Sequence, residues 1–428
     1  MKLISLFIRG LIVTIVYVTP LMAGDGSAPP AVLGVRIEFI LFGLTLLGVA
    51  LFHHRTLEVA LSGLTAITIY KLAVVGFDIV SHLQHEASIL INLLGLLLGF
   101  AILAKHFEES GIPDVLPAWL PQGWVGGFIL LGLVWIMSAF LDNIAAAMIG
   151  GTIALVVFKK KVHIGFLAAI VAASNAGGAG SVVGDTTTTM MWIDGVSAFH
   201  VMPAFLAAAV ALLSFGIFAA KQQFRHQPIV ASDNLDLKID WVKILVVAMI
   251  LAGAITTNVM FDFPAAGVWI AILVGSFFCK TAWHELPHAL KGSIFLLSLV
   301  LCASMMPVEE LPPASWQTAF ALGFVSSVFD NIPLTKLALQ QGGYDWGVLA
   351  YAVGFGGSMI WFGSSAGVAI SNIFPEVKSV GLWLKHGWHI AMAYVIAFFV
   401  MLWIMGWNPH EPHKTEAVTE QSHVIMQK

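Results

Sequence analysis

Long apolar stretches separated by short polar segments make up most of this 428-residue chain. A helix needs about 20 apolar residues to cross the hydrocarbon core, so the longer stretches are candidate membrane-spanning helices. The stretches that fit a single crossing lie at residues 32–52, 57–77, 88–104, 199–220, 241–260, 265–279, 293–306 and 388–404. The pattern predicts an all-α polytopic membrane protein surrounded by lipid.

Two apolar regions do not fit a single crossing. As one helix, residues 122–158 would be about 55 Å long, well beyond the roughly 30 Å of a bilayer core. A re-entrant hairpin with Asp142 and Asn143 at its tip fits better, and residues 316–339 repeat the pattern around Asp330 and Asn331. Each hairpin is followed by an apolar span that glycine and serine interrupt, at 164–192 and 346–373. We expect these two spans to be discontinuous helices.

The Asp-Asn hairpin and the glycine-rich break therefore occur twice. The first copy contains SAFLDNIAAAMIGG and SNAGGAGSVVGDTTTT, and the second contains SSVFDNIPLTKLAL and GFGGSMIWFGSSAG. Gly178 and Gly184 have the same spacing as Gly357 and Gly363. Charge and broken backbone are both costly in hydrocarbon, so their duplicated pairing indicates a transport site.

The distribution of lysine and arginine predicts the orientation in the membrane. With Lys159–Lys161 inside, most of the 20 Lys and Arg residues fall in inner loops, whereas outer loops such as HLQHEAS contain none. The arrangement predicts about ten crossings, with both mature ends outside, in the inner membrane of a bacterium. The first hairpin then opens from the cytoplasm and the second from the opposite side, which makes the halves inverted repeats.

The N-terminal segment resembles a secretory signal peptide, with Lys2 and Arg9 before an apolar run and a small residue at Ala23. An uncleaved anchor is the alternative, because Leu21 is larger than the residue preferred before a cleavage site. The predicted divisions are a signal peptide at 1–23, a first repeat half at 31–225, a cytoplasmic linker at 226–240, an inverted second half at 241–407 and a polar tail at 408–428.

Composition excludes several classes of protein. The chain is 59% hydrophobic and only 10% charged, with a mean hydropathy of +0.91, which excludes a soluble protein. The net charge of −4 gives no reason to expect a nucleic-acid partner. Cys279 and Cys302 lie in or beside apolar segments without metal-ligand spacing, which favours packing roles.

Asp142, Asp185 and Asp330 are the candidate chemical groups, since a carboxylate near the bilayer centre is costly unless it is paired, hydrated or protonated. Asp142 and Asp330 could be helix N-caps, but their occurrence at matched positions of opposed repeats favours ion binding, and one turn can serve both roles. Asp185 precedes Thr186–Thr189. The threonines could instead bond back to helix carbonyls, and for Thr188 and Thr189 we expect packing.

The two glycine breaks are chemically unequal. The first offers Ser174, Asn175, Asp185 and Thr186, oxygen donors of the kind that hard cations prefer. The second offers Ser358, Ser364 and Ser365, with no carboxylate opposite Asp185. The first half is therefore where we expect Na⁺, at Asp142, Asn175 and Asp185. The predicted cation- and proton-binding residues are Asp142, Asn143, Ser174, Asn175, Asp185, Thr186, Asp330, Asn331, Ser364 and Ser365.

Two lysines also lie within apolar segments. Lys336 could pair with Asp330 across the hairpin or extend to the outer interface. For Lys71 we expect a structural ion pair within the first bundle, where Asp78 is a neighbouring acid.

His284-Glu285-Leu286-Pro287-His288 matches the zinc-protease pattern HExxH. Pro287 removes a backbone N–H and disfavours a helical conformation at Leu286, so the histidines are not expected to share a helical face. We set a zinc site and an enzyme function aside.

The two motifs resemble those of NhaD-type sodium/proton antiporters. NAGGAGSVVGDTTTTMMW, LDN, FDNIPL and GGSMIWFGSSAGV carry the resemblance, which covers residues 88–367. The superfamily also includes citrate, dicarboxylate and arsenite carriers. The resemblance implies an inverted-repeat fold, commonly dimeric through a scaffold domain, so a homodimer is a candidate assembly. It implies ligand contacts at Asp142, Asn143, Asn175, Asp185, Thr186, Asp330, Asn331 and Ser364.

The chain departs from this family at Gly180, where an aromatic residue is expected, and at Val182–Val183, which replaces a proline-containing pair. These departures bear on the shape of the cavity and on ion selectivity rather than on the fold.

The expected function is antiport of Na⁺ or Li⁺ against H⁺ by alternating access, with cation and proton competing for the same carboxylates. No cofactor is expected beyond these transported ions. The alternative is an anion carrier for citrate, a dicarboxylate or arsenite. Aspartates at both hairpin tips argue against an anion, which helix N-termini and neutral side chains would bind better.

Overall fold

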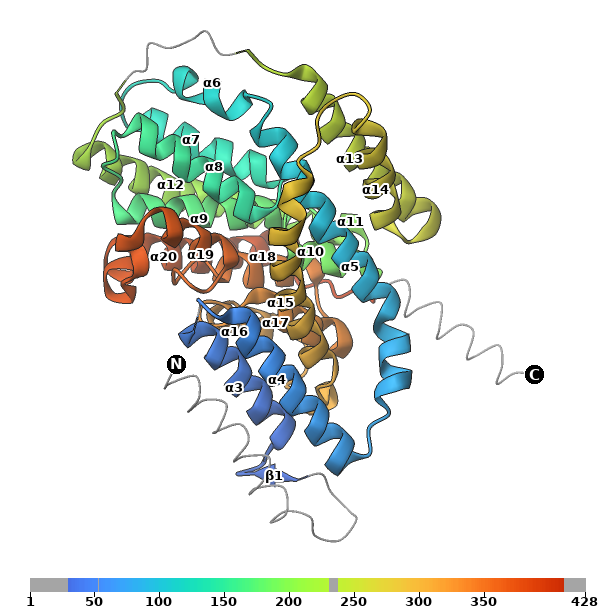
Figure 1. Ribbon diagram of the computed structural model, residues 1–428. Coiled ribbons are helices and arrows are strands. Elements are labelled where there is room, and N and C mark those ends of the chain that lie inside the picture. The colour runs from blue at the N-terminus through green and yellow to red at the C-terminus, as the bar shows by residue number, and fades with distance from the viewer. Residues whose placement is uncertain (1–29, 53, 231–237, 412–428) are drawn as a thin grey trace.

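The structure, a computed structural model, describes residues 30–52, 54–230 and 238–411. The predicted signal peptide, the tail beyond residue 411 and residues 231–237 of the predicted linker lie outside the described residues. Within them, a two-residue antiparallel pairing of β1 (Ala31–Val32) with β2 (Val35–Arg36) precedes a chain that is otherwise helical (Figure 1).

Six helical segments are long and apolar enough to cross a membrane, by length and composition, among the described residues. They are α4 (Thr56–Tyr70) with η2 (Lys71–Val75), α5 (Ile79–Glu108), α11 (Ala198–Val201) with α12 (Ala204–His226), α13 (Trp241–Phe261), η3 (Trp283–Glu285) with α15 (Leu286–Ser304), and α20 (Val380–Met405). Shorter elements at the periphery are α3 (Ile37–Leu51), α6 (Ile112–Trp119), α14 (Pro264–Gly275), η4 (Val308–Glu310) and η5 (Pro375–Lys378). The chain is an all-α polytopic membrane protein.

Helix α5 corrects one sequence prediction. The segment HLQHEAS was expected to be an outer loop, but it forms early turns of α5, which begins at Ile79 and runs for 30 residues. At about 1.5 Å per residue, α5 is some 45 Å long, enough to cross the core at a tilt and project beyond it. Polar residues therefore continue into the helix from its N-terminal end.

Two helical hairpins form at the Asp-Asn dipeptides. The first joins α7 (Trp124–Ser138) to α8 (Asn143–Val157), and the second joins α16 (Trp316–Ser326) to α17 (Asn331–Gln341). In each hairpin the second helix begins at the asparagine.

The glycine-rich segments separate pairs of helices. Helix α9 (Ile164–Ala179) ends before α10 (Thr186–Ile193), and α18 (Trp346–Gly356) ends before α19 (Ser365–Ile373). Glycine is needed at these breaks because backbone approaches backbone closely there. A Cβ on Gly184 would lie 2.1 Å from the Ser138 carbonyl oxygen, and one on Gly363 would lie 2.4 Å from that of Ser327. The same contact thus joins each break to the end of its hairpin's first helix.

The elements of the two copies pack together around α9, which is buried along almost its full length. It contacts α7, α8 and α12 of its own half, and α18, α19 and α20 of the other (Figure 1). Helix α19 also packs on α8, and α10 packs on α17. The two hairpins and the two breaks therefore share one core, with α3 and α4 adding a smaller hydrophobic cluster beside α15.

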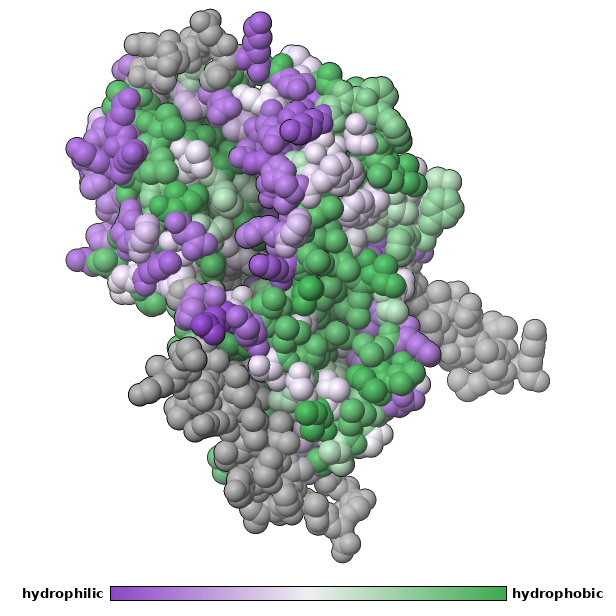
Figure 2. Space-filling model, in the orientation of Figure 1, coloured by the Kyte–Doolittle hydropathy of each residue, from purple (hydrophilic) through white to green (hydrophobic). Residues whose placement is uncertain are grey.

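The surface has the polarity expected of a membrane protein. Figure 2 shows hydrophobic side chains over the lower and right-hand parts of one face, where α15, α13 and α14 lie in Figure 1. Hydrophilic side chains gather at the upper left and in a line toward the middle of the view.

The polar segments at the ends of the second half pack on the helices. Asn408 donates its backbone N–H to Asp345, and the Trp346 indole N–H donates to the carbonyl oxygen of His410. The start of the predicted tail is thus attached to the N-terminal end of α18, although its side chains are exposed. In the linker, Val230 donates its N–H to Val157 and Asp240 caps α13.

Candidate cation site

Four helices in the core begin at residues that the sequence predicted for the site. Each side chain accepts a hydrogen bond from a backbone N–H of its own helix: Asp142 from Ile144 at 3.2 Å, Asp185 from Thr187 at 2.8 Å, Asp330 from Ile332 at 3.1 Å and Ser364 from Gly367 at 3.3 Å. The N-cap interpretation therefore holds at both Asp-Asn dipeptides. Each aspartate uses a single oxygen for these bonds, which leaves its other oxygen for a different partner.

The caps also bear on the polarity of the site. Helix N-termini carry partial positive charge and favour anions. At three of these four N-termini the chain supplies the anion itself, as Asp142, Asp185 or Asp330. A carboxylate of the chain therefore faces three of these positive ends, whereas the N-terminus of α19 faces the neutral hydroxyl of Ser364.

A buried hydrogen-bond network connects the first hairpin, the first break and the second break. Asn143 Nδ2 donates to Asp185 Oδ2 at 3.0 Å and to Asn175 Oδ1 at 3.1 Å. Asn175 Nδ2 donates in turn to Ser358 Oγ at 2.9 Å. All four residues are buried, with at most 5% of their surface exposed. The amide of Asn143 therefore fixes the uncapped oxygen of Asp185 and orients the oxygen of Asn175.

Ser358 was noticed in the second break but was not among the predicted binding residues. Its sequence signal is weak because a serine in a glycine-rich segment usually serves the turn itself. Only the packing of α9 against the second break brings it to Asn175.

The hydroxyls of the first break are largely occupied. Ser174 Oγ donates to the carbonyl oxygen of Val171, a bond within its own helix. Thr188 and Thr189 both donate to the carbonyl oxygen of Asp185, as the packing interpretation predicted. Thr186 lines the large cavity beside the site, as Thr189 also does.

A cavity of about 1550 Å³ leads from a charged rim to the first half-site. Asp142, Asp185, Thr186 and Thr189 line its inner part. The charged and histidine side chains that line it elsewhere are His54, Arg55, Glu58, Lys105, Glu108, Glu109, Asp114, Glu285, His288 and Lys291. The cavity thus gives the two carboxylates of the first half a route to solvent.

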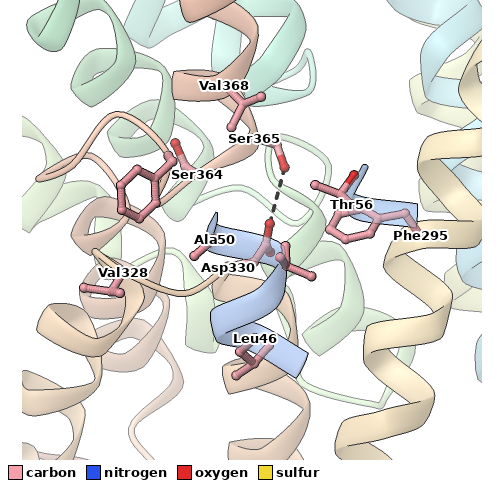
Figure 3. A pocket seen from close by; sticks show the side chains of 11 residues that line it. Leu46, Ala50, Thr56, Phe295, Val328, Asp330, Ser364, Ser365 and Val368 are labelled. Carbon is pink, nitrogen blue, oxygen red and sulfur yellow. Dashed lines mark hydrogen bonds between the residues drawn. The ribbon is translucent and has the colours of Figure 1, made fainter. Parts of the chain in front are cut away.

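A smaller cavity of about 170 Å³ lies at the second half-site (Figure 3). Asp330 and Ser365 point toward one another in it, with Ser365 Oγ donating to Asp330 Oδ2 at 3.5 Å, and Ser364 lies nearby. Thr56 and Phe295 line both cavities. Asn331 is buried beside Asp330 at the start of α17. The two half-sites are therefore separate but adjacent, and only the first contains two carboxylates.

Residues 46–356 match the citrate transporter family (CitMHS). The chain belongs to this family. Sodium/proton antiporter 2 of Arabidopsis thaliana is 27% identical over 398 residues, which cover 80% of this chain and 92% of that protein. The Na(+)/H(+) antiporter NhaD of Vibrio parahaemolyticus is 26% identical, covering 69% of this chain and 88% of that protein. Sodium/proton antiporter 1 of Arabidopsis thaliana is 26% identical over 69% of this chain, and the match spans 58% of that protein.

Membership of the citrate transporter family makes the chain a secondary transporter and confirms the resemblance drawn from the two glycine breaks. One departure from that resemblance has a structural explanation. A Cβ on Gly180 would lie 2.4 Å from Cγ of Phe205, so the Phe205 ring on α12 fills the space beside the break. An aromatic side chain at 180 is replaced here by one from a neighbouring helix.

Both predictions about intramembrane lysines in this transporter were wrong. Lys336 does not pair with Asp330 and does not extend to the outer interface. Its Nζ lies 2.8 Å from Glu86 Oε2 on α5. Lys71 Nζ donates to the carbonyl oxygen of Met305 at 2.8 Å and lies over the Phe77 ring, while Asp78 caps α5. Glu86 escaped notice because its segment looked like a loop.

The HELPH segment also differs from expectation. Leu286 is helical and opens α15, with Pro287 in the first turn, where the missing N–H costs nothing. His284 lies before that helix, on η3. Among the described residues no group of three or more His, Cys, Asp or Glu side chains is placed to hold a metal ion.

Proposed function

We propose that this chain exchanges Na⁺ or Li⁺ for H⁺ across the bacterial cytoplasmic membrane by alternating access. One observation carries the proposal: Asp185 lies buried at the inner end of the large cavity, with Asn143 holding one oxygen, and Asp142 lines the same space. Neither aspartate has an ion-pair partner among the described residues, and carboxylates held away from bulk water in this way readily bind a proton or a metal cation. That choice is what couples the two fluxes.

The network assigns different roles to the predicted residues. Asp142, Asp185 and the Asn175 amide oxygen supply oxygen ligands for Na⁺. Asn143 presents its amide hydrogens to Asp185 and Asn175, so it positions the ligands rather than contacting the cation through that group. Asp330, Ser364 and Ser365 form a second, weaker half-site.

Helix lengths support re-entrant hairpins and inverted repeats. Helices α7 and α8 have 15 residues each and α16 and α17 have 11. At about 1.5 Å per residue these helices span only some 16–23 Å, less than the roughly 30 Å core. The matched glycine contacts of Gly184 and Gly363 support a common origin of the two halves.

The large cavity faces the cytoplasm in this arrangement. Its lining includes Arg55, Lys105 and Lys291, which the lysine and arginine count places inside. The structure then corresponds to an inward-facing state in which cytoplasmic Na⁺ reaches Asp142 and Asp185. The homodimer implied by the resemblance is a separate proposal, which cross-linking in native membranes tests.

Transport of a citrate-like anion is the second candidate. The family's description and the cavity volume of about 1550 Å³, far larger than one cation needs, favour it. The acidic inner end opposes it, because a polycarboxylate would meet Asp142 and Asp185 unless bound cations neutralised them first.

Fluorescence dequenching in everted membrane vesicles decides between the two functions. After respiration acidifies the vesicle lumen, adding Na⁺ or Li⁺ should release protons and restore fluorescence, whereas K⁺ and citrate should not. Uptake of labelled citrate, with no response to any alkali cation, would establish the anion carrier instead.

A further inference from the structure

A second buried charged pair lies outside the half-sites, between α5 and α17. Lys336 Nζ and Glu86 Oε2 are 2.8 Å apart, and their side chains are only 3% and 4% exposed. Glu86 Oε2 makes no hydrogen bond besides this ionic contact. Removing one partner from such a pair leaves an uncompensated buried charge, so the protonation state of Glu86 determines whether Lys336 is neutralised.

The lysine side of the pair is connected to the second half-site. Lys336 lies on α17, whose N-cap is Asp330. Six residues of helix place the two about 9 Å apart along its axis. The positive charge of Lys336 therefore acts on Asp330 whenever Glu86 does not cancel it.

The glutamate side of the pair is connected to the outer end of α5. Asp78, His82 and Glu86 are spaced four residues apart, so they lie on one face of the helix. Asp78 is exposed, His82 is half-buried and Glu86 is buried. Hydrogen bonds from Ser81 hold the pKa of Asp78 below its usual range, so Asp78 is ionised at the outer surface. His82 is held by a 2.9 Å hydrogen bond between Nε2 and Ser304 Oγ.

Other titratable and charged groups lie on the elements around this pair. His82 and His85 share its helix, and Lys71 lies nearby on η2. The adjoining helices α10 and α14, and α15 from Gly292 onward, contain no acidic or basic residue. Further acids lie at the edges of this region: Asp185 caps α10, and Glu309 and Glu310 lie on η4, which packs against α17. Within ion-pair distance of Glu86, the described residues place Lys336 alone.

We propose that Glu86 is a proton-binding site, reached from the outer side through His82, whose protonation weakens Na⁺ binding at Asp330. A proton from outer water binds the His82 imidazole and passes to a Glu86 carboxylate oxygen, which leaves His82 neutral. The Lys336 ammonium then loses its counter-charge and repels a cation held by Asp330, whose position on α17 is about 9 Å away along the helix axis. Outer protons thereby promote release of Na⁺ at the outer face. This inference rests on the proposed Na⁺/H⁺ exchange and adds a proton site distinct from the aspartates.

Charge substitution tests the coupling directly in right-side-out vesicles, by measuring the outer Na⁺ concentration that half-saturates ²²Na⁺/Na⁺ exchange. At alkaline outer pH, Glu86→Gln leaves Lys336 unpaired and should raise that concentration by on the order of tenfold. Adding Lys336→Gln should restore it to the wild-type value. His85→Gln, on the same helix but off the Asp78–Glu86 face, is the matched control and should behave as wild type.

The inference is overturned if Glu86→Gln needs the same Na⁺ concentration for half-saturation as the wild type. It is also overturned if adding Lys336→Gln does not return that concentration to the wild-type value. Should Glu86→Gln fail to reach the membrane, the double variant still decides. Between alkaline and acidic outer pH, the Na⁺ concentration for half-saturation should change about tenfold less in the double variant than in the wild type. A pH response equal to that of the wild type overturns the inference. Absence of any Na⁺ flux in the wild type would instead refute the proposed exchange itself.

The route through His82 is tested by the rate at which Na⁺ exchange responds to a change in outer pH. After a rapid drop in outer pH, His82→Gln should slow the fall in ²²Na⁺ exchange at least several-fold, without changing its final level. A wild-type response time in His82→Gln, with His85→Gln as reference, contradicts this route.

Discussion

At the scale of single residues, the aspartates of the two hairpins act as helix N-caps, in addition to the ion-binding role proposed for them. Three aspartates are helix N-caps: Asp142, Asp185 and Asp330. Each side chain accepts a hydrogen bond from the first turn of its helix, so it stays in place unless that turn unwinds. The cap consumes one oxygen and leaves the other directed elsewhere. Fixed carboxylates of this kind are suited to ion exchange because little reorganisation accompanies binding.

Asn143 and its counterpart Asn331 should differ strongly in importance. Asn143→Ala removes the hydrogen bonds to Asp185 and Asn175, and a bond to a charged group contributes about 1.5–3 kcal/mol. The Na⁺ concentration for half-maximal dequenching should therefore rise about tenfold or more. Asn331→Ala, in the half-site with a single carboxylate, should change it far less. Equal effects would contradict the unequal half-sites.

His163 gives the protein a predictable response to acid. It caps α9 through a hydrogen bond from Gly165, and desolvation, followed by the neighbouring His386 and His226, lowers its pKa to about 4. Because the unfolded value is about 6.5, the unfolded chain binds the proton first, and stability falls as pH drops from about 6.5 toward 4.

His163→Asn keeps a capping oxygen but does not titrate in this window. Thermal denaturation of the purified protein at several pH values should therefore show a flatter loss of stability between pH 6.5 and 4 in this variant than in the wild type. Parallel curves would show that His163 makes no such contribution.

At the scale of elements, close backbone contacts attach each hairpin to its glycine break. The contact leaves no room for a methyl group at Gly184 or Gly363, whereas a Cβ on Gly132 would meet nothing within 4 Å. Small residues of this kind let helices approach in membranes, where packing rather than hydrophobicity drives association.

Gly184→Ala and Gly363→Ala should each destabilise the protein, by about 1–3 kcal/mol, as overpacked sites commonly do. Gly132→Ala on the exposed side of α7 is the matched control and should be neutral. The midpoint of thermal denaturation in detergent measures both. A wild-type midpoint in Gly184→Ala would show that the break can move away from Ser138.

Much of the arrangement of helices, hairpins and glycine breaks could be predicted from the sequence. The apolar pattern located the hairpins and both breaks, because costly polar backbone in a membrane segment is easily seen. The partners of individual side chains could not be predicted. For Lys336 the sequence offers Asp330 in its own hairpin or the outer interface, yet its partner Glu86 lies 250 positions earlier and reaches it only through the packing of α5. Asn143, Asn175 and Ser358 likewise meet only once α9 lies between the two halves.

At the scale of the whole molecule, one cavity connects a charged surface to the two carboxylates of the first half. Its lining mixes both signs of charge at the rim and becomes acidic at its inner end, which favours cations as they approach. The opposite end of α5 gives the proposed proton route. Under the proposed function, Na⁺ reaches Asp142 and Asp185 through this cavity, and under the further inference outer protons reach Glu86 from the opposite side of the membrane.

Accessibility of introduced cysteines tests this orientation. In a chain with Cys279 and Cys302 replaced by alanine, Thr152→Cys in the cavity should react with a membrane-impermeant maleimide in everted vesicles only. Val80→Cys, exposed near the outer end of α5, should react in right-side-out vesicles only. The reverse pattern would invert the topology and place the cavity on the outer side.

The central claim is that Asp142 and Asp185 exchange a proton for Na⁺. The most direct measurement is proton release by the purified protein on adding Na⁺, followed with a pH indicator in weakly buffered detergent solution. The wild type should release protons in proportion to Na⁺ bound, and Asp142→Asn and Asp185→Asn should each abolish that release while the protein stays folded. Wild-type proton release in both variants would contradict the account.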